Sequence, residues 1–225
     1  MASYNNNNRP TTTTNLAEIR SLNELDKKIY TKEEIKNFRL DEAIREHPLI
    51  KKPTSARSKL AYKELMSNLK PTTKYLLPGQ LVLFRYAHPK FKEELEYYDA
   101  SPLTLFCGII RTKDDTIREI GLNLHYYPPQ IRTRILIHTY EAFRPYFEEY
   151  FNSPSRKPNM MISYDALKGI MKRNEKIAFG IKMYIPILRG TSYVVPTRLI
   201  PTASYTEGHF SKATLNQIFH FWRTF

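Results

Sequence analysis

Three stretches in the middle of the chain carry the apolar patterning of β-strands, and turn residues separate them. Residues 81–86 follow the turn dipeptide Pro78-Gly79, and residues 102–111 are apolar at nearly every position, which is typical of a strand buried on both faces. Residues 117–126 alternate between an apolar face (Ile120, Leu122, Leu124) and a small or polar face (Gly121, Asn123, His125). The pattern predicts three strands, the second of them inside a barrel or sandwich.

Apolar residues at helical spacing occur on both sides of these strands. Pro128-Pro129 stops the third strand and starts a helix over residues 131–143, which Pro145 ends or kinks. Narrow apolar stripes predict helices within residues 16–70, including one that begins near Ser55. Stripes this narrow favour helices that pack on another part of the protein.

The C-terminal part of the chain predicts a mixture of elements. Ser163 is a candidate cap for a short helix, and residues 176–201 predict a hairpin with its turn at Arg189-Gly190-Thr191. Residues 211–225 predict a last helix with an aromatic side. This helix either folds back on the core or docks into a partner through Phe219, Trp222 and Phe225.

These patterns predict an α+β protein made of four segments. The segments are a low-complexity tail (1–15), a helical N-terminal region (16–75), a β-strand core with its helix (76–151), and a helix, hairpin and aromatic helix (152–225). The tail has no apolar core, so we expect it to be disordered alone and to lie along a neighbouring subunit in an assembly. Its candidate docking residues are Asn5, Asn6, Asn7, Asn8 and Arg9.

The charge of the chain favours an acidic partner. Its 225 residues include 35 Lys and Arg against 22 Asp and Glu, a net charge of +13. Such a surface attracts nucleic acid at low salt, or it meets an acidic protein, or it is simply solvated. The single cysteine, Cys107, lies in an apolar run and is interpreted as core filler, which suits a reducing compartment.

Several classes of protein are disfavoured by what the sequence lacks. Seven glycines provide neither GxxxxGK[ST] nor GxGxxG, and the six histidines are dispersed without an HExxH or HxH pattern. We therefore expect no cofactor, no metal and no enzymatic activity. No apolar run reaches the length of a membrane span and no signal peptide is evident, so we expect a soluble protein made in the cytoplasm.

One set of residues could form a nuclease-like centre. Asp99, Asn123 and His125 fall near strand ends, and Arg132 and Arg134 could contact phosphate. The favoured interpretation is structural: Asp99 caps the turn before Pro102, while Asn123 and His125 bond to the following helix.

Two further groups of side chains could contact nucleic acid. The helix near Ser55 and its approach are rich in cations, so that face is solvated, or contacts phosphate, or contacts an acidic partner. The candidate contacts are Lys51, Lys52, Arg57, Lys59 and Lys63, with Arg132 and Arg134. Tyr97-Tyr98 and Tyr126-Tyr127 either stack on bases or, as the favoured alternative, close the end of a small barrel.

The motifs PGQLVLFRY, YYDASPLTL and GLNLHYYPP resemble a family of tailed-bacteriophage virion structural proteins. The resemblance covers about 65 residues, and GLNLHYYPP is its distinctive element. It implies a small SH3-like β-barrel with flanking helices, a helical N-terminal region and an extended N-terminal tail. Some members of that family are DNA end protectors, and a ring protein of the neck in a crAss-like phage is the most specific implied identity.

Two functional hypotheses follow from this resemblance. In the first, the protein is a subunit of a homo-oligomeric ring at the portal-proximal neck of the virion, assembled through its extended termini with portal, neck or tail proteins. In the second, it is a non-specific double-stranded DNA-binding protein that protects DNA ends at genome packaging. Both hypotheses place the protein near packaged DNA, without a membrane or a catalytic site.

Overall fold

The computed structural model describes residues 39–72, 76, 78–86, 94–152, 168–169, 172–173, 175–185 and 191–223, with backbone alone for 141–152 and 221–223. Contacts divide the chain into two compact units. The first contains Met1–Phe38 and Arg144–Lys157, of which the last turns of one helix are described. The second contains Arg39–Phe143 and Pro158–Phe225, and it is the unit analysed below. The helices predicted before residue 39 and the helix from Ser163 lie outside the described residues.

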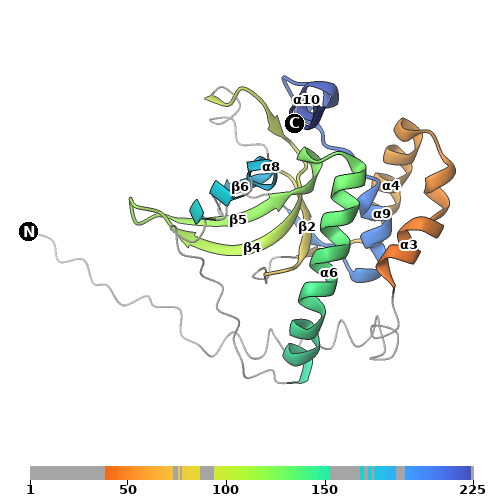
Figure 1. The fold of residues 1–225 in the computed structure, drawn as a ribbon, viewed down its shortest axis with the longest axis horizontal. Helices are drawn as coiled ribbons and strands as arrows, with labels where there is room; N and C mark the ends of the chain where they lie inside the picture. Colours follow the sequence, from red (N-terminus) through yellow and green to blue (C-terminus); the bar gives the residue numbers. More distant parts are fainter. Residues whose placement is uncertain are drawn as a thin grey trace, which may run out of the picture. The chain divides into compact units, whose positions relative to one another are not determined.

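A six-stranded antiparallel sheet forms the centre of this second unit (Figure 1). Its strand order is β1-β7-β2-β4-β5-β6, and β3 and β8 form a separate antiparallel pair. The strands are β1 (Pro71–Thr72), β2 (Leu81–Phe84), β3 (Tyr98–Asp99), β4 (Leu103–Arg111), β5 (Ile117–Asn123), β6 (Ile181–Tyr184), β7 (Ser192–Val194) and β8 (Phe210–Ser211). The α+β class is confirmed, whereas the described strands form an open sheet and do not close into the SH3-like barrel that the resemblance implies.

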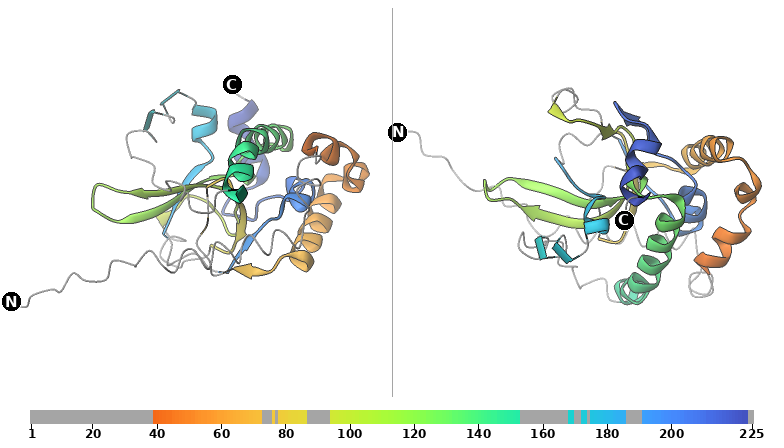
Figure 2. Two further views of the ribbon diagram at one scale, coloured as in Figure 1. Left: turned by 90° about the horizontal axis from the view of Figure 1, so that it is seen from below. Right: turned by 45° about the horizontal axis from the view of Figure 1, so that its top comes forward.

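The three strands predicted from apolar patterning are present as β2, β4 and β5, but β5 ends at Asn123, and Leu124–Tyr126, predicted as its last residues, form a turn of 3-10 helix. β4 is apolar along its length because core clusters pack against it: Phe106 lies with Val82 and Phe84 in one, and Ile110 lies with Ile120 in another. β4 and β5 form the long hairpin that extends from the sheet in all three views (Figures 1 and 2). A β-bulge between Phe106 and Gly108 shifts the register within this hairpin.

The hairpin predicted over residues 176–201 is wrong in its pairing. β6 pairs with β5, whereas β7 pairs with β1 and β2 on the far side of the sheet. Each strand thus adds to a different part of the same sheet. The C-terminal segment completes the sheet that the middle segment begins, so these two predicted segments share one core.

Helices and short turns of helix complete the described fold. They are α3 (Leu40–Glu46), η1 (Pro48–Lys51), α4 (Thr54–Asn68), η2 (Leu124–Tyr126), α6 (Pro129–Asn152), α8 (Glu175–Ala178), η4 (Thr197–Leu199), α9 (Ile200–Ser204) and α10 (Leu215–Arg223). The helix predicted from Ser55 is α4, and the helix predicted after Pro128 begins at Pro129 and continues through Pro145. None of the described helices is long and apolar enough to cross a membrane.

The N-terminal helices of this unit pack against a helix from the far end of the chain. α3 and α4 both contact α9. The contact is polar as well as apolar: His47 Nε2 lies 2.9 Å from Thr202 Oγ1, and the Tyr205 hydroxyl donates to the Ile44 carbonyl at 2.6 Å. A narrow apolar stripe is therefore enough to pack α3 and α4 against the rest of the unit, because each helix buries a single side.

Gly121 lies where the sheet leaves no room for a side chain. It stands opposite Phe106 on β4 and Lys182 on β6. A Cβ at this position would collide with Thr104 Cγ2 and lie 2.9 Å from the Leu105 carbonyl oxygen. The glycine of the GLNLHYYPP motif is thus explained by close packing between β4 and β5.

We expect Gly121→Ala to lower the free energy of unfolding by about 1–3 kcal/mol, because the added methyl group displaces packed neighbours. Urea denaturation of the purified protein measures the change. Gly169→Ala is the matched control, since within the described part of the chain a Cβ at Gly169 meets Arg173 Nη2 alone, at an ordinary 3.4 Å. Equal stabilities of the two variants would contradict the packing argument.

Candidate nucleic-acid interface

Asp99, Asn123 and His125 do come together in the fold, in its interior. His125 Nδ1 lies 2.7 Å from Asp99 Oδ2, and Asn123 Nδ2 donates to the same oxygen at 3.1 Å. The other ring nitrogen, Nε2, lies 3.2 Å from Thr206 Oγ1. The side chains of Asp99 and His125 are each 1% exposed, so neither reaches a substrate.

The backbone around Asp99 explains why this cluster is structural. The second carboxylate oxygen, Oδ1, accepts from the N–H groups of Ser101 at 3.1 Å and His209 at 3.2 Å. The first of these bonds is the turn cap that the sequence predicts. The Asn123 side chain caps the short turn of helix that follows it, Leu124–Tyr126, because its Oδ1 accepts the His125 N–H at 3.0 Å. The described side-chain contacts of Asn123 and His125 otherwise go to Asp99 and Thr206, and not to the helix predicted after Pro128-Pro129. The cluster joins β3 and β5 to the segment before β8.

The burial of this cluster sets its protonation. Burial lowers the pKa of His125 below its ordinary value, although Asp99 opposes this shift, so the ring is neutral near pH 7. Burial alone would raise the pKa of Asp99, but His125, Ser101 and Asn123 bring it below its ordinary value. The carboxylate is therefore ionised and accepts the Nδ1 proton of His125.

Arg132 is not a phosphate contact, which corrects the sequence prediction. Its side chain is fully buried, and its guanidinium donates to the carbonyls of Leu124 at 2.9 Å, Tyr127 at 3.2 Å and Ser204 at 3.2 Å, and to that of Thr206. Burial lowers the pKa of Arg132 to about 10, which still leaves it charged. This arginine holds the η2 corner against the segment after α9.

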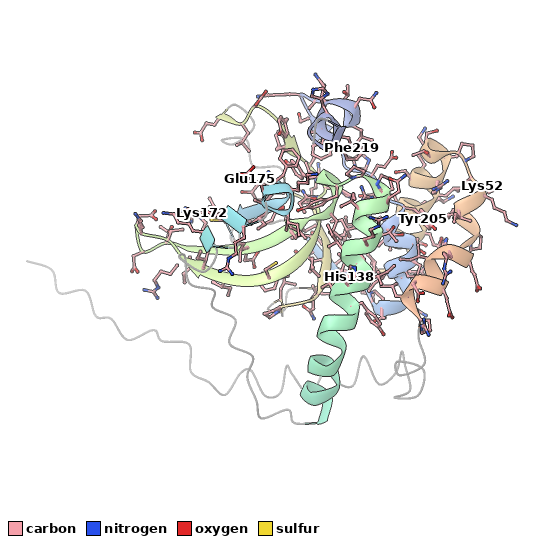
Figure 3. The ribbon with its side chains drawn as sticks, viewed as in Figure 1. Lys52, His138, Lys172, Glu175, Tyr205 and Phe219 are labelled. Atoms are coloured by element: carbon pink, nitrogen blue, oxygen red, sulfur yellow. The ribbon has the colours of Figure 1, made fainter. Side chains whose placement is uncertain are left out.

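The remaining predicted cations differ in how far they can reach a ligand. Lys51, Lys52, Lys59, Lys63 and Arg134 are exposed. Figure 3 shows the Lys52 side chain pointing away from the body. Arg57 is half-buried and already engaged, because its guanidinium donates to the carbonyls of Ile50 and Lys52 and lies over the Tyr205 ring. We use the name α4 face for the four exposed lysines on α4 and directly before it, Lys51, Lys52, Lys59 and Lys63.

The proposed docking residues are mostly beyond the described side chains. Asn5 to Asn8, Arg9 and Phe225 lie outside the described residues, and Trp222 is described by its backbone alone. Phe219 is half-buried on α10, whose Ile218 is buried. Docking through either terminus stays a prediction.

A pocket of about 480 Å³ opens beside the Asp99 cluster, between β3 and β6. Tyrosines make up much of its wall: Tyr86, Tyr97, Tyr98, Tyr126 and Tyr184. Two cations also line it, Arg118 from β5 and Lys182 from β6. The two tyrosine pairs singled out in the sequence each contribute to this pocket, whereas no barrel exists among the described strands for them to close.

Lys182 is a cation of the pocket wall that lies against aromatic rings. Its Nζ lies 4.0 Å from the centroid of the Tyr126 ring and 5.4 Å from that of Phe179. Among the described residues no carboxylate forms an ion pair with it, and burial lowers its pKa to about 8. The sequence patterns did not single out Lys182 or Arg118. The available signal was a single cation within the otherwise apolar strand IKMY.

The described residues contain no group of three or more His, Cys, Asp or Glu side chains that could hold a metal ion.

The buried cluster and the tyrosine pocket do not by themselves identify a protein family, whereas similarity to known proteins does. A protein-family model described as phage T4 terminal DNA protecting protein matches residues 1–193. The chain belongs to this family.

Membership of the terminal DNA protecting protein family bears on the two hypotheses from sequence. The resemblance to phage proteins is confirmed at the level of a phage family, and the match agrees with the DNA end protector hypothesis better than with the neck ring. The matched range includes both α4 and the tyrosine pocket. No curated protein and no solved structure matches the chain significantly.

Proposed function

We propose that this protein binds the ends of linear double-stranded phage DNA and protects them from exonucleases, without catalysing a reaction itself. The observation that carries the proposal is the match of residues 1–193 to the terminal DNA protecting protein family. A net charge of +13 and the exposed lysines of the α4 face support it, because phosphate contacts supply most of the affinity of non-specific DNA binding.

Protection of DNA ends is expected to be directly measurable. Purified protein should slow the digestion of a linear duplex by a processive double-strand exonuclease, and leave cleavage of the same duplex by a restriction endonuclease at an internal site unchanged. The second reaction is the control, because a protein that merely coats DNA slows both. Exonuclease digestion at the unprotected rate, at protein concentrations that saturate binding, would contradict the proposal.

The α4 face offers a variant of the same experiment. Replacing Lys52, Lys59 and Lys63 with glutamine should weaken duplex binding and reduce the slope of log K against log salt by about 0.9 for each phosphate that these lysines neutralise. Lys113→Gln on the β4–β5 turn removes an exposed charge elsewhere and serves as the comparison. An unchanged salt slope in the α4 variant would assign DNA binding to another surface.

The absence of catalysis belongs to the same proposal. The acid–base cluster of Asp99 and His125 supports it, since its 1% exposed side chains cannot approach a phosphodiester. Linear DNA incubated with the protein and Mg²⁺, without exonuclease, should stay intact.

Assembly into a ring at the portal-proximal neck is the second proposal, and it is compatible with end protection. It derives from the resemblance of GLNLHYYPP to virion structural proteins. Native mass spectrometry of the full chain, alone and with a linear duplex, measures the number of copies. A monomer under both conditions would remove the ring and leave end binding as the function.

A further inference from the structure

The tyrosine pocket has the size and wall of a small-molecule site, and it is separate from the exposed α4 face. Its volume of about 480 Å³ falls in the range of about 300–1,000 Å³ typical of ligand pockets. Tyr97 and Tyr98 are half-buried at its wall. Ring faces of this kind accept planar ligands, including nucleic acid bases.

The charges of the wall favour an anionic ligand. Of its two carboxylates, Asp99 is occupied by His125, Asn123 and two backbone N–H groups, which leaves the exposed Glu96. The cations of the wall are Arg118, which donates a long 3.4 Å bond to the Ile117 carbonyl and interacts electrostatically with Asp114, and Lys182, which forms no ion pair with a carboxylate among the described residues. Two cations in one pocket wall are suited to a phosphate group.

The volume also limits how much of a nucleic acid can enter. A pocket of this size accommodates one nucleotide and is too small for a base pair with both sugars. A nucleotide within a continuous duplex is stacked on both sides and paired, so its entry requires both unstacking and unpairing. A terminal nucleotide is stacked on one side and enters with less loss.

We propose that this pocket binds the terminal nucleotide of a DNA strand, with its base on Tyr97 or Tyr98 and its phosphate at Arg118 and Lys182. The inference rests on the proposed end-binding function and gives it a site. The α4 face contributes affinity for any duplex, and the pocket contributes the preference for an open end. Burial lowers the pKa of Lys182 to about 8, and the negative charge of a bound phosphate would oppose this shift by favouring the charged form of the lysine.

The test compares open and closed DNA of equal length. Fluorescence anisotropy measures binding to a blunt duplex, to duplexes with 5′ or 3′ overhangs of two nucleotides, and to a dumbbell whose ends are closed by loops. We expect the full-length protein to bind the open duplexes more tightly than the dumbbell. The preferred overhang identifies which strand enters the pocket.

Pocket variants decide where the end preference resides. Arg118→Gln and Lys182→Gln should each reduce the affinity for open duplexes about tenfold and leave dumbbell binding unchanged, and Tyr97→Leu should act in the same direction. Lys113→Gln, the matched control outside the pocket, should leave the end preference intact. Thermal unfolding of each variant establishes that the fold is retained.

The outcomes separate the two proposals. An end preference that survives all three pocket variants overturns the pocket assignment and leaves the proposed function standing. Equal affinity of the unaltered protein for the dumbbell and the open duplexes overturns the proposed function. Binding of a free mononucleotide at the pocket without any effect on duplex binding would reassign the pocket to a nucleotide ligand and also overturn the DNA-end assignment.

Discussion

Replacing Arg132 with alanine is expected to lower the free energy of unfolding by more than about 3 kcal/mol, the largest effect predicted for a single side chain. The substitution removes the guanidinium donor from four carbonyls, those of Leu124, Tyr127, Ser204 and Thr206, although the Leu124 carbonyl still accepts the Tyr127 N–H. It also opens a cavity at a fully buried position. Most small domains are stable by only about 5–15 kcal/mol, so the loss is a large part of the total.

Arg134→Ala is the matched control for this prediction, because it removes the same side chain from an exposed position two residues along α6. Its effect should stay within about 0.5 kcal/mol. Urea denaturation followed by circular dichroism measures both variants. Where Arg132→Ala does not yield folded protein, Arg132→Lys, which keeps the charge and loses most of the donors, should show an intermediate loss. Equal stabilities of the Arg132 and Arg134 variants would contradict the structural role of Arg132.

The second large effect is a loss of stability in acid. Burial lowers the pKa of His125 below 6.5, so below about pH 6.5 the unfolded chain binds a proton that the folded protein does not. The stabilisation is therefore present above pH 6.5 and falls, by up to about 1.4 kcal/mol per pH unit, as the pH drops toward the folded pKa. Asp99, whose folded pKa lies below 3.8, adds a loss of the same sign at lower pH.

His125→Asn isolates this contribution. The asparagine amide can donate to Asp99 in place of Nδ1 and does not titrate. We expect the variant to be less stable at pH 7.5 by about 1–3 kcal/mol and to lose less stability than the unaltered protein between pH 6.5 and 5. Urea denaturation at several pH values measures both quantities.

Two histidines serve as references for the pH measurement. Burial also lowers the pKa of His47, which contributes equally to both proteins and cancels in the comparison. His138→Asn, which makes the same substitution at an exposed position on α6, is the control for the substitution itself. A His125→Asn variant whose pH dependence matches that of the unaltered protein would show that His125 does not set it.

Much of the local structure could be predicted from the chain because it depends on neighbours in sequence. Alternating or continuous apolar runs identify β2, β4 and β5, and Pro128-Pro129 identifies the start of α6. The Asp99 turn was predicted for the same reason, since its carboxylate bonds two residues ahead to Ser101. These elements need only local sterics and local hydrogen bonds.

The predictions that failed depend on contacts between distant segments. β6 and β7 have the sequence of a hairpin, but β6 pairs with β5 and β7 pairs with β2 in the sheet. Arg132 and Arg134 look alike in sequence, whereas the buried side of α6 contains Arg132 with Leu136 four residues later. The apolar residues Ile131 and Ile135, one position earlier on the helix, are only half-buried, and an arginine is rarely fully buried unless it has partners, so the sequence does not distinguish Arg132 from Arg134.

In the candidate site, too, some features follow from the sequence and others from contacts between distant segments. Sequence alone determined that the protein is α+β and strongly basic, and that it has the motifs of a phage protein without those of common enzymes. Tertiary structure decided that Asp99 and His125 are buried together, and that Tyr97, Tyr98, Arg118 and Lys182 line one pocket. The physical reason is that a pocket forms where strands far apart in the chain pack side by side, and the pairing of β5 with β6 is a property of the whole sheet.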